Sequence, residues 1–477
     1  MQFMRWNKWS WLISAFIVFL IVLVGIRFWS YFSFSIPLGY DHGMYRAFFM
    51  ILQDQLPYID FSHLPAWIQA TYEPFSGLFS LASLRGLWVS VDMFLLRWVG
   101  ILHLLISVFI YLLLRKYNRT TAIIWVVLYL TSIIQYQVFW WGYIKQMMGV
   151  LFILTAYYLL EKKSYRLLLP ILIWLFTVNR AGGIFFLISF VVYKIVVWIQ
   201  EKSWTWKDVW PVILAWVFSI IIYRPVLNQQ IFSLLWPMFG HAFIWEQSGT
   251  FFGKAQYALY NCIYIGLSIW WLIVWRKKSF HKKIPLEVIW FVVGIVRVWL
   301  QLFFYNRMLG YLDIFVVILA AYGLSYLLVS RNNLWKYLGI WIYILQLLFF
   351  VWHVQRTSFP LIVDTEWESI RQIPTIIPVD AKIMVTGRKY SAFLMGYASH
   401  HIIAPGLFDL DAWTQEQWNT WHFGDGALKC QLLKAMDTTH RPNYLWIGSL
   451  QPFEQLSWAT CLQKILWDAT YWFYIVH

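Results

Sequence analysis

Long apolar stretches separated by short polar ones dominate the first 353 residues. A transmembrane helix needs about 20 mostly apolar residues, so this pattern predicts a polytopic α-helical membrane protein with about 11 transmembrane helices. The predicted spans are residues 9–32, 92–114, 120–140, 143–160, 166–178, 184–200, 209–227, 256–275, 285–304, 309–329 and 335–353. The fifth span is short, so it and the sixth form either two crossings, which we favour, or one re-entrant hairpin.

The pattern changes after residue 353 to short alternating segments, which are typical of strands. These segments predict strands at residues 382–386, 402–404, 444–447 and 471–476, with helices near 414–421 and 453–465. We therefore expect residues 354–477 to form a small α/β domain. Residues 1–353 are expected to form the transmembrane domain, with a large first external loop at 33–91.

Composition and charge agree with a membrane protein. The chain is 61% hydrophobic and 12% charged, whereas soluble proteins have about 25% charged residues. The tail holds nine Lys/Arg against eleven Asp/Glu, so the net charge of +15 comes from short basic runs between the apolar stretches. Cytoplasmic loops have this pattern, and no nucleic-acid-binding motif accompanies it. The prediction is a plasma (inner) membrane protein with a cytoplasmic N-terminus, a retained first span and an extracytoplasmic C-terminal domain.

The three cysteines do not suggest a metal site. Cys262 lies in the eighth predicted span, and no pair has the spacing of a metal-binding motif. Cys430 and Cys461 both lie in the predicted exported tail, where an oxidising compartment permits a disulfide. Two free buried thiols are an equally good interpretation of the sequence.

Asp41 is the first acidic residue after the first span, next to a Gly-flanked turn. A carboxylate at this membrane boundary can take a proton from an acceptor hydroxyl or bind a cation. The alternative is a structural role as the N-cap of the helix that follows, because Asp is favoured at that position.

The segment Asp41-His42-Gly43-Met44-Tyr45 resembles the D-E-x-x-Y element of aminoarabinose transferases and protein O-mannosyltransferases, with His42 in place of the second acid. These enzymes belong to the GT-C superfamily of membrane glycosyltransferases, which use polyprenyl-phosphate-linked sugars. The many spans and the exported C-terminal domain fit the same family. The resemblance implies that Asp41 is the catalytic base and that the donor is a polyprenyl-phosphate-linked sugar.

Four basic residues lie at predicted outer membrane boundaries, where positive charge is otherwise scarce: Lys145, Arg180, Arg224 and Arg307. A departing lipid phosphate needs such cations, and arginine offers a planar fork of donors. The segment around Arg307 also resembles the short arginine-bearing loop of related transferases. We expect all four to bind the donor phosphate, although snorkelling to lipid headgroups would equally explain each one.

Four loop residues are candidates for binding the acceptor or supporting the site: His42, Tyr45, Asp60 and Glu73. No cofactor and no metal ligand are predicted, but His42 in place of an acid leaves the need for a divalent metal open. A structural salt bridge is expected between Arg297 in the ninth span and Asp313 in the tenth.

The leading hypothesis is an inverting glycosyltransferase that moves a sugar from a polyprenyl-phosphate donor to a glycan, lipid or protein acceptor on the extracytoplasmic side. The alternative is a transporter or flippase of a lipid-linked or anionic substrate. That alternative favours midplane charges, paired broken helices and inverted repeats, of which the sequence gives little sign. A non-catalytic assembly protein is the third interpretation.

Overall fold

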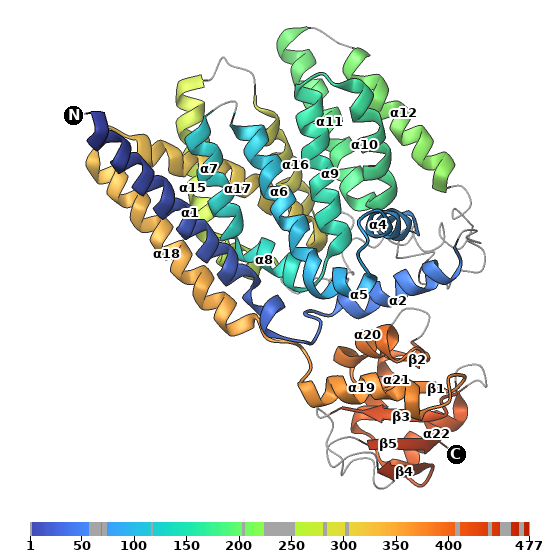
Figure 1. The fold of residues 1–477 in the computed structure, drawn as a ribbon. Coiled ribbons are helices and arrows are strands. Elements are labelled where there is room, and N and C mark those ends of the chain that lie inside the picture. Colours follow the sequence, from blue (N-terminus) through green and yellow to red (C-terminus); the bar gives the residue numbers. More distant parts are fainter. Residues whose placement is uncertain are drawn as a thin grey trace. The chain divides into compact units, whose positions relative to one another are not determined.

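In the structure, a computed structural model, each apolar run predicted to span the membrane is mainly helical over its described residues (Figure 1). The run 92–114 is continued from α5 (Val91–Met93) through a π-helical turn at Phe94–Trp98 into α6 (Val99–Leu114). The structure describes residues 2–56, 68, 74–115, 118–202, 206–223, 253–279, 284–300, 305–405, 411–436, 441–448, 459–466 and 472–476. Contacts divide the chain into a helical unit (Met1–Ser33, Glu73–Ser76 and Trp98–Ser358) and a sheet unit (Phe34–Tyr72, Gly77–Arg97 and Phe359–His477).

The described part of the helical unit is built from helices. They are α1 (Gln2–Ser33), α6 (Val99–Leu114), α7 (Arg119–Leu130), α8 (Ile133–Trp140), α9 (Ile144–Glu161), α10 (Tyr165–Val178), α11 (Arg180–Glu201), α12 (Trp206–Tyr223), α14 (Lys254–Tyr260), α15 (Cys262–Ser279), α16 (Leu286–Trp299), α17 (Tyr305–Val329) and α18 (Asn333–Thr357). Helix α17 packs against α7, α15, α16 and α18, and it is the most buried of the candidate spans.

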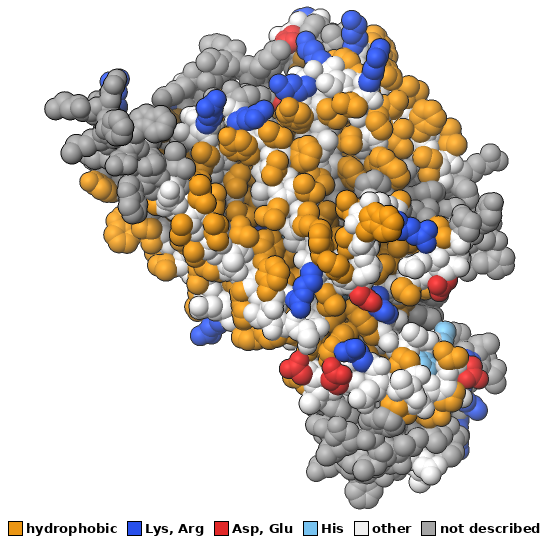
Figure 2. Space-filling model, in the orientation of Figure 1, with side chains coloured by type: hydrophobic (Ala, Val, Ile, Leu, Met, Phe, Trp, Pro, Cys, Tyr) orange, Lys and Arg blue, Asp and Glu red, His pale blue; other side chains and the backbone are white. Residues whose placement is uncertain are grey.

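The outward-facing side chains of this unit are apolar. Figure 2 shows hydrophobic side chains over much of the visible face of the helices, and Ile21, Trp198 and Leu345 are each more than half exposed. A surface of this kind is stable in lipid rather than in water. Within the described residues, six helices are long and apolar enough to cross a membrane, or up to eight if each of two bent pairs is one span. The protein is therefore an integral membrane protein, while the count of about 11 crossings stays a prediction.

Two of the predicted spans are broken. Helices α7 and α8 meet at a bend of 52°, and α14 and α15 meet at one of 76°. The breaks occur at Thr131–Ser132 and at Asn261, where polar side chains interrupt apolar sequence. The sequence analysis did not predict these paired broken helices.

Asp313 of α17 links both breaks. Ser132 Oγ and Gln135 Nε2 donate hydrogen bonds to Asp313 Oδ2 at 2.8 and 2.9 Å. Asn261 Nδ2 donates to Oδ1 at 2.6 Å. The carboxylate is fully buried, so these bonds replace the water that a break in a helix otherwise needs.

The predicted Arg297–Asp313 salt bridge is wrong. Among the described residues no ion pair joins them, because the Asp313 carboxylate is occupied by donors from the two helix breaks. A different buried cation, Arg27 of α1, lies near these breaks and donates from Nη1 to the carbonyl of Leu130 at 2.6 Å. The positive charge of Arg27 is favourable at the C-terminus of α7, where Leu130 lies. The negative charge of Asp313 is likewise favourable at the N-terminus of α8.

Replacing Asp313 should destabilise the helical unit. Asp313→Ala removes the acceptor of Ser132 Oγ and Asn261 Nδ2, at a cost of about 1–3 kcal/mol for each buried donor. Gln135 Nε2 keeps its second acceptor, the carbonyl of Gly310. We expect a clearly lower melting temperature for the purified protein in detergent, with Asp313→Asn intermediate because one oxygen remains. Asp380→Ala, at an exposed turn, is the control and should leave the melting temperature unchanged. Equal melting of the Asp313→Ala variant and the wild type would refute this role.

The sheet unit contains a five-stranded sheet of order β2-β1-β3-β5-β4. Its strands are β1 (Lys382–Val385), β2 (His401–Ile403), β3 (Tyr444–Ile447), β4 (Leu462–Leu466) and β5 (Trp472–Val476). Strand β1 is parallel to β2 and β3, whereas β5 is antiparallel to β3 and β4. Its helices are α2 (Asp41–Asp54), α5 (Val91–Met93), α19 (Asp364–Ile376), α20 (Arg388–Tyr397), α21 (Gln415–Phe423) and α22 (Gly426–Ala435), while α4 (Pro74–Gly86) begins in the helical unit.

Alternating strand residues build a core on each face of this sheet. Ile383 and Val385 of β1 pack with α19 and α20, while Met384 packs with α21 and α22 on the other face. Side chains of a strand alternate between faces, so the short apolar strands supply both cores. The sheet is thus covered by helices on both sides.

Most of the strand predictions are confirmed, and one helix prediction is wrong. The predicted strands at 382–386, 402–404, 444–447 and 471–476 match β1, β2, β3 and β5, and the helix predicted near 414–421 is α21. Residues 453–458 of the helix predicted at 453–465 lie outside the described residues, and its end is instead strand β4 from Leu462 onward. Pairing with β5 along its whole length favours the extended form there.

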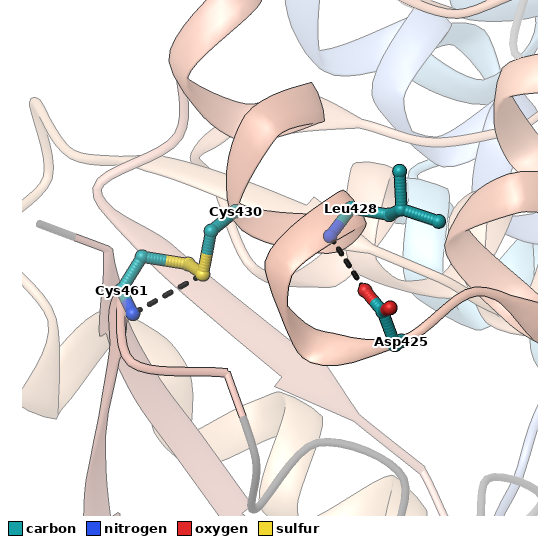
Figure 3. The surroundings of a disulfide bond; sticks show 4 residues. All are labelled: Asp425, Leu428, Cys430 and Cys461. Atoms are coloured by element: carbon teal, nitrogen blue, oxygen red, sulfur yellow. Dashed lines mark hydrogen bonds between the residues drawn. A yellow bond between two sulfur atoms is a disulfide. The ribbon is translucent and has the colours of Figure 1, made fainter.

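Cys430 and Cys461 form a disulfide (Figure 3), which decides between the two interpretations of the sequence. The bond joins α22 to the turn before β4 across 31 residues. Asp425, next to it in Figure 3, caps α22 by accepting a hydrogen bond from the Leu428 N–H at 2.8 Å. The edge of the sheet is therefore held covalently to a covering helix.

Candidate functional site

Asp41 begins helix α2 of the sheet unit and is half-buried. Tyr40, not Asp41, takes the N-cap position, and no side chain caps the helix there. The N-cap interpretation of Asp41 is therefore wrong. A carboxylate in the first turn still interacts favourably with the helix dipole.

The two predicted neighbours of Asp41 are buried. His42 is fully buried and Tyr45 is 3% exposed. Burial lowers the pKa of His42 to about 3, opposed by a hydrogen bond with the Leu38 backbone. His42 is consequently neutral at physiological pH. It therefore carries no charge at the position where the related motif has its second acid.

Helix α2 lies against α20 at a very close crossing. A Cβ atom added to Gly43 would lie 2.1 Å from the carbonyl oxygen of Ala392, and one added to Gly396 would lie 2.3 Å from that of Gly43. Real contacts of a Cβ are never this short, so both positions require glycine. This crossing fixes the segment that carries Asp41.

Arg46 strengthens the same junction. Its Nε lies 2.6 Å from Asp92 Oδ1, its Nη1 donates to the carbonyl of Gly396, and its guanidinium stacks 4.6 Å from the ring centre of Tyr397. Tyr40, before the helix, bonds through its hydroxyl to Ser391 Oγ at 2.6 Å. These contacts connect α2 to α5 and α20. The sequence analysis missed them because every partner is distant in sequence.

Gly43→Ala should separate α2 from α20. The new methyl group meets backbone atoms that cannot rotate away, and overpacking of this kind costs about 1–3 kcal/mol or more. We expect faster limited proteolysis of the sheet unit and a lower melting temperature. Gly86→Ala is the matched control, because a Cβ there meets nothing within 4 Å. Unchanged proteolysis in the Gly43→Ala variant would contradict the close crossing.

The predicted phosphate ligands of the helical unit are brought together by their backbones. Asn179 Nδ2 donates to the carbonyl of Lys145 at 2.7 Å, and Asn179 Oδ1 accepts from the N–H of Gly182 at the start of α11. Lys145 lies in the first turn of α9, and Arg180 is the first residue of α11. The starts of these two helices are therefore adjacent.

Helix α17 completes the cluster. Gln146 Nε2 donates to the carbonyl of Arg307 at 3.2 Å. The Tyr311 hydroxyl lies close to two glycines. A Cβ atom added to Gly149 would lie 2.6 Å from this hydroxyl, and one added to Gly182 would lie 3.1 Å from it. The starts of α9, α11 and α17 thus converge, and we call Lys145, Arg180 and Arg307 with these helix starts the cationic cluster. Two of its supports, Gln146 and Asn179, are uncharged and were not singled out from the sequence as site residues.

Several predicted site residues lie outside the described residues. Arg224, Asp60 and Glu73 are among them, as is the side chain of Arg180. Their roles stay predictions. In the part of the chain that the structure describes, no group of three or more His, Cys, Asp or Glu residues could hold a metal ion.

No protein-family model and no curated protein sequence matches the chain, but solved structures do. The oligosaccharyltransferase AglB from Archaeoglobus fulgidus, in complex with an inhibitory peptide and a dolichol-phosphate, is 11% identical with a TM-score of 0.52, over 93% of this chain and 70% of that one. The apo oligosaccharyltransferase of the same organism is 10% identical with a TM-score of 0.60, over 96% and 73%. ArnT from Cupriavidus metallidurans in the apo state is 12% identical with a TM-score of 0.56, over 96% and 98%. The chain therefore shares the fold of AglB and ArnT.

Proposed function

We propose that this protein is an inverting glycosyltransferase that moves a sugar from a polyprenyl-phosphate donor to an acceptor on the extracytoplasmic side of the membrane. The observation that carries the proposal is the convergence of the starts of α9, α11 and α17, each with a basic residue, in a fold shared with AglB and ArnT. The dolichol-phosphate bound to AglB is a lipid phosphate of the same chemical class.

The proposed reaction needs a base and cations but no acid. Asp41 takes the proton from the acceptor hydroxyl, and the acceptor oxygen forms a bond to the anomeric carbon of the sugar. The bond from that carbon to the phosphate oxygen breaks, and its electron pair leaves with the polyprenyl phosphate. Lys145, Arg180 and Arg307 stabilise the negative charge that develops on this phosphate. A single displacement inverts the configuration at the anomeric carbon.

A transfer assay tests this proposal. The purified protein is incubated with a polyprenyl-phosphate-linked sugar and a cell-envelope extract as the acceptor, and the product is examined by NMR. The proposal predicts a glycosylated product with the anomeric configuration opposite to that of the donor. A product with the donor's configuration would contradict the single displacement.

Transport of a lipid-linked or anionic substrate is the second candidate, and the broken helices favour it. The two bent pairs, α7–α8 and α14–α15, are joined by the buried Asp313, and transporters use such breaks at their binding sites. We favour transfer because the solved structures that share this fold include an oligosaccharyltransferase and ArnT.

A further inference from the structure

A cavity of about 260 Å³ lies at one end of the helical unit, where α6 and α9 end and α7 begins. Its lining residues are Tyr111, Leu112, Arg115, Arg119, Tyr158 and Lys162, and we call it the basic pocket. Helix α6 packs against both α7 and α9, so the three helix ends that form the pocket are fixed relative to one another. In the view of Figure 2, Lys and Arg side chains gather near this end of the helices.

The basic pocket has an excess of positive charge. Three of its six lining residues are basic and none is acidic. No ion pair among the described residues engages Arg115, Arg119 or Lys162. The ammonium group of Lys162 lies 5.8 Å from the ring centre of Tyr158, a weak interaction that does not neutralise it.

The helix dipoles explain only part of this arrangement. Arg115 and Lys162 follow the C-termini of α6 and α9, where a cation is favourable. Arg119 is the first residue of α7, where the dipole is positive and a cation is unfavourable. All three cations are exposed, so water screens part of their mutual repulsion, and an anion bound among them relieves the rest.

The pocket is distinct from the cationic cluster. Lys145 is in the first turn of α9, and Lys162 follows its last residue. At 1.5 Å per residue the two ends of this helix are about 26 Å apart. One ligand therefore does not reach both places.

We propose that the basic pocket binds the phosphate of an anionic phospholipid headgroup. Arginine forks bind phosphate oxygens in pairs, and the two tyrosine hydroxyls add further donors. The volume equals that of about nine water molecules at about 30 Å³ each, which accommodates a phosphate and part of a glycerol headgroup. Basic pockets at the cytoplasmic ends of membrane helices bind acidic lipids in this way. The positive-inside pattern of the sequence predicts that the end of the helices with the basic pocket is the cytoplasmic one. The proposal is independent of the proposed glycosyltransferase activity.

Native mass spectrometry of the purified protein tests the pocket. Phosphatidylglycerol, phosphatidylcholine and inorganic phosphate are titrated separately against the wild type and the R115Q/R119Q/K162Q variant. We expect phosphatidylglycerol to bind the wild type at least tenfold more tightly than phosphatidylcholine does, and the variant to lose at least tenfold in affinity for phosphatidylglycerol. The R166Q/K207Q/R331Q variant removes three exposed basic residues outside the pocket and should bind as the wild type does.

Two results would overturn the proposal. The first is equal loss of phosphatidylglycerol binding in both triple variants, which would mean that general charge attracts the lipid. The second is inorganic phosphate binding as tightly as phosphatidylglycerol and displacing it, which would make free phosphate the ligand. The single variant R119Q, at an exposed position, keeps the test decisive if the triple variant does not fold, because it should also weaken phosphatidylglycerol binding.

Discussion

The Asp41→Asn variant is expected to lose sugar transfer while keeping its expression level and membrane insertion. The amide has the size of the carboxylate but cannot take a proton from the acceptor hydroxyl. General-base catalysis contributes about 10²–10⁴-fold to a rate, so we expect a loss of that size in the turnover number. Binding of the donor should change little, because the base acts on the acceptor.

Matched variants separate this chemical effect from misfolding. Asp380→Asn makes the same change at an exposed turn before β1 and should transfer sugar at the wild-type rate. The Asp41→Asn variant should retain the wild-type proteolysis pattern, since the Gly43–Gly396 crossing remains intact. Wild-type turnover by Asp41→Asn would remove the proposed base.

The second large effect is expected at Arg307. In the proposed mechanism Arg307 stabilises the leaving phosphate, and loss of one such cation in the alanine variant lowers the rate by about 10²–10³-fold. Arg307→Lys should recover part of the activity, because the charge returns without the planar fork. Transfer rates and donor affinity are measured together in both variants.

Arg331→Ala is the control for this prediction. Arg331 is exposed just beyond the other end of the same helix, α17, and should tolerate the change. If Arg307→Ala and Arg331→Ala behave alike, Arg307 is a snorkelling residue and the assigned phosphate ligand is wrong. Equal activity of the Arg307→Lys variant and the wild type would show that only the charge at this position matters.

The helices could be predicted from sequence because the signal is local. A run of about 20 apolar residues satisfies its backbone hydrogen bonds within itself, so the predicted spans are mainly helical over their described residues. The breaks were missed because Thr131–Ser132 and Asn261 are short polar interruptions in apolar sequence. What stabilises them is Asp313, between 52 and 181 residues away along the chain.

Non-local contacts account for the other errors. Strand β4 was predicted as a helix because its sequence carries no strong alternation, and its extended form comes from pairing with β5. Arg297 and Asp313 are near in sequence, yet donors from other helices occupy the carboxylate. The family resemblance predicts Asp41 as the base, but the packing of its helix through Gly43 and Arg46 depends on α20, about 350 residues later.

The chemical fate of the donor tests the central claim most directly. The purified protein is reconstituted into liposomes that contain a polyprenyl-phosphate-linked sugar, a cell-envelope extract is added outside, and the lipid is analysed by mass spectrometry. The account predicts that free polyprenyl phosphate accumulates in equal amount to the glycosylated product, and that Asp41→Asn prevents both. Sugar that stays attached to its lipid while moving to the other leaflet would contradict the account and identify a transporter.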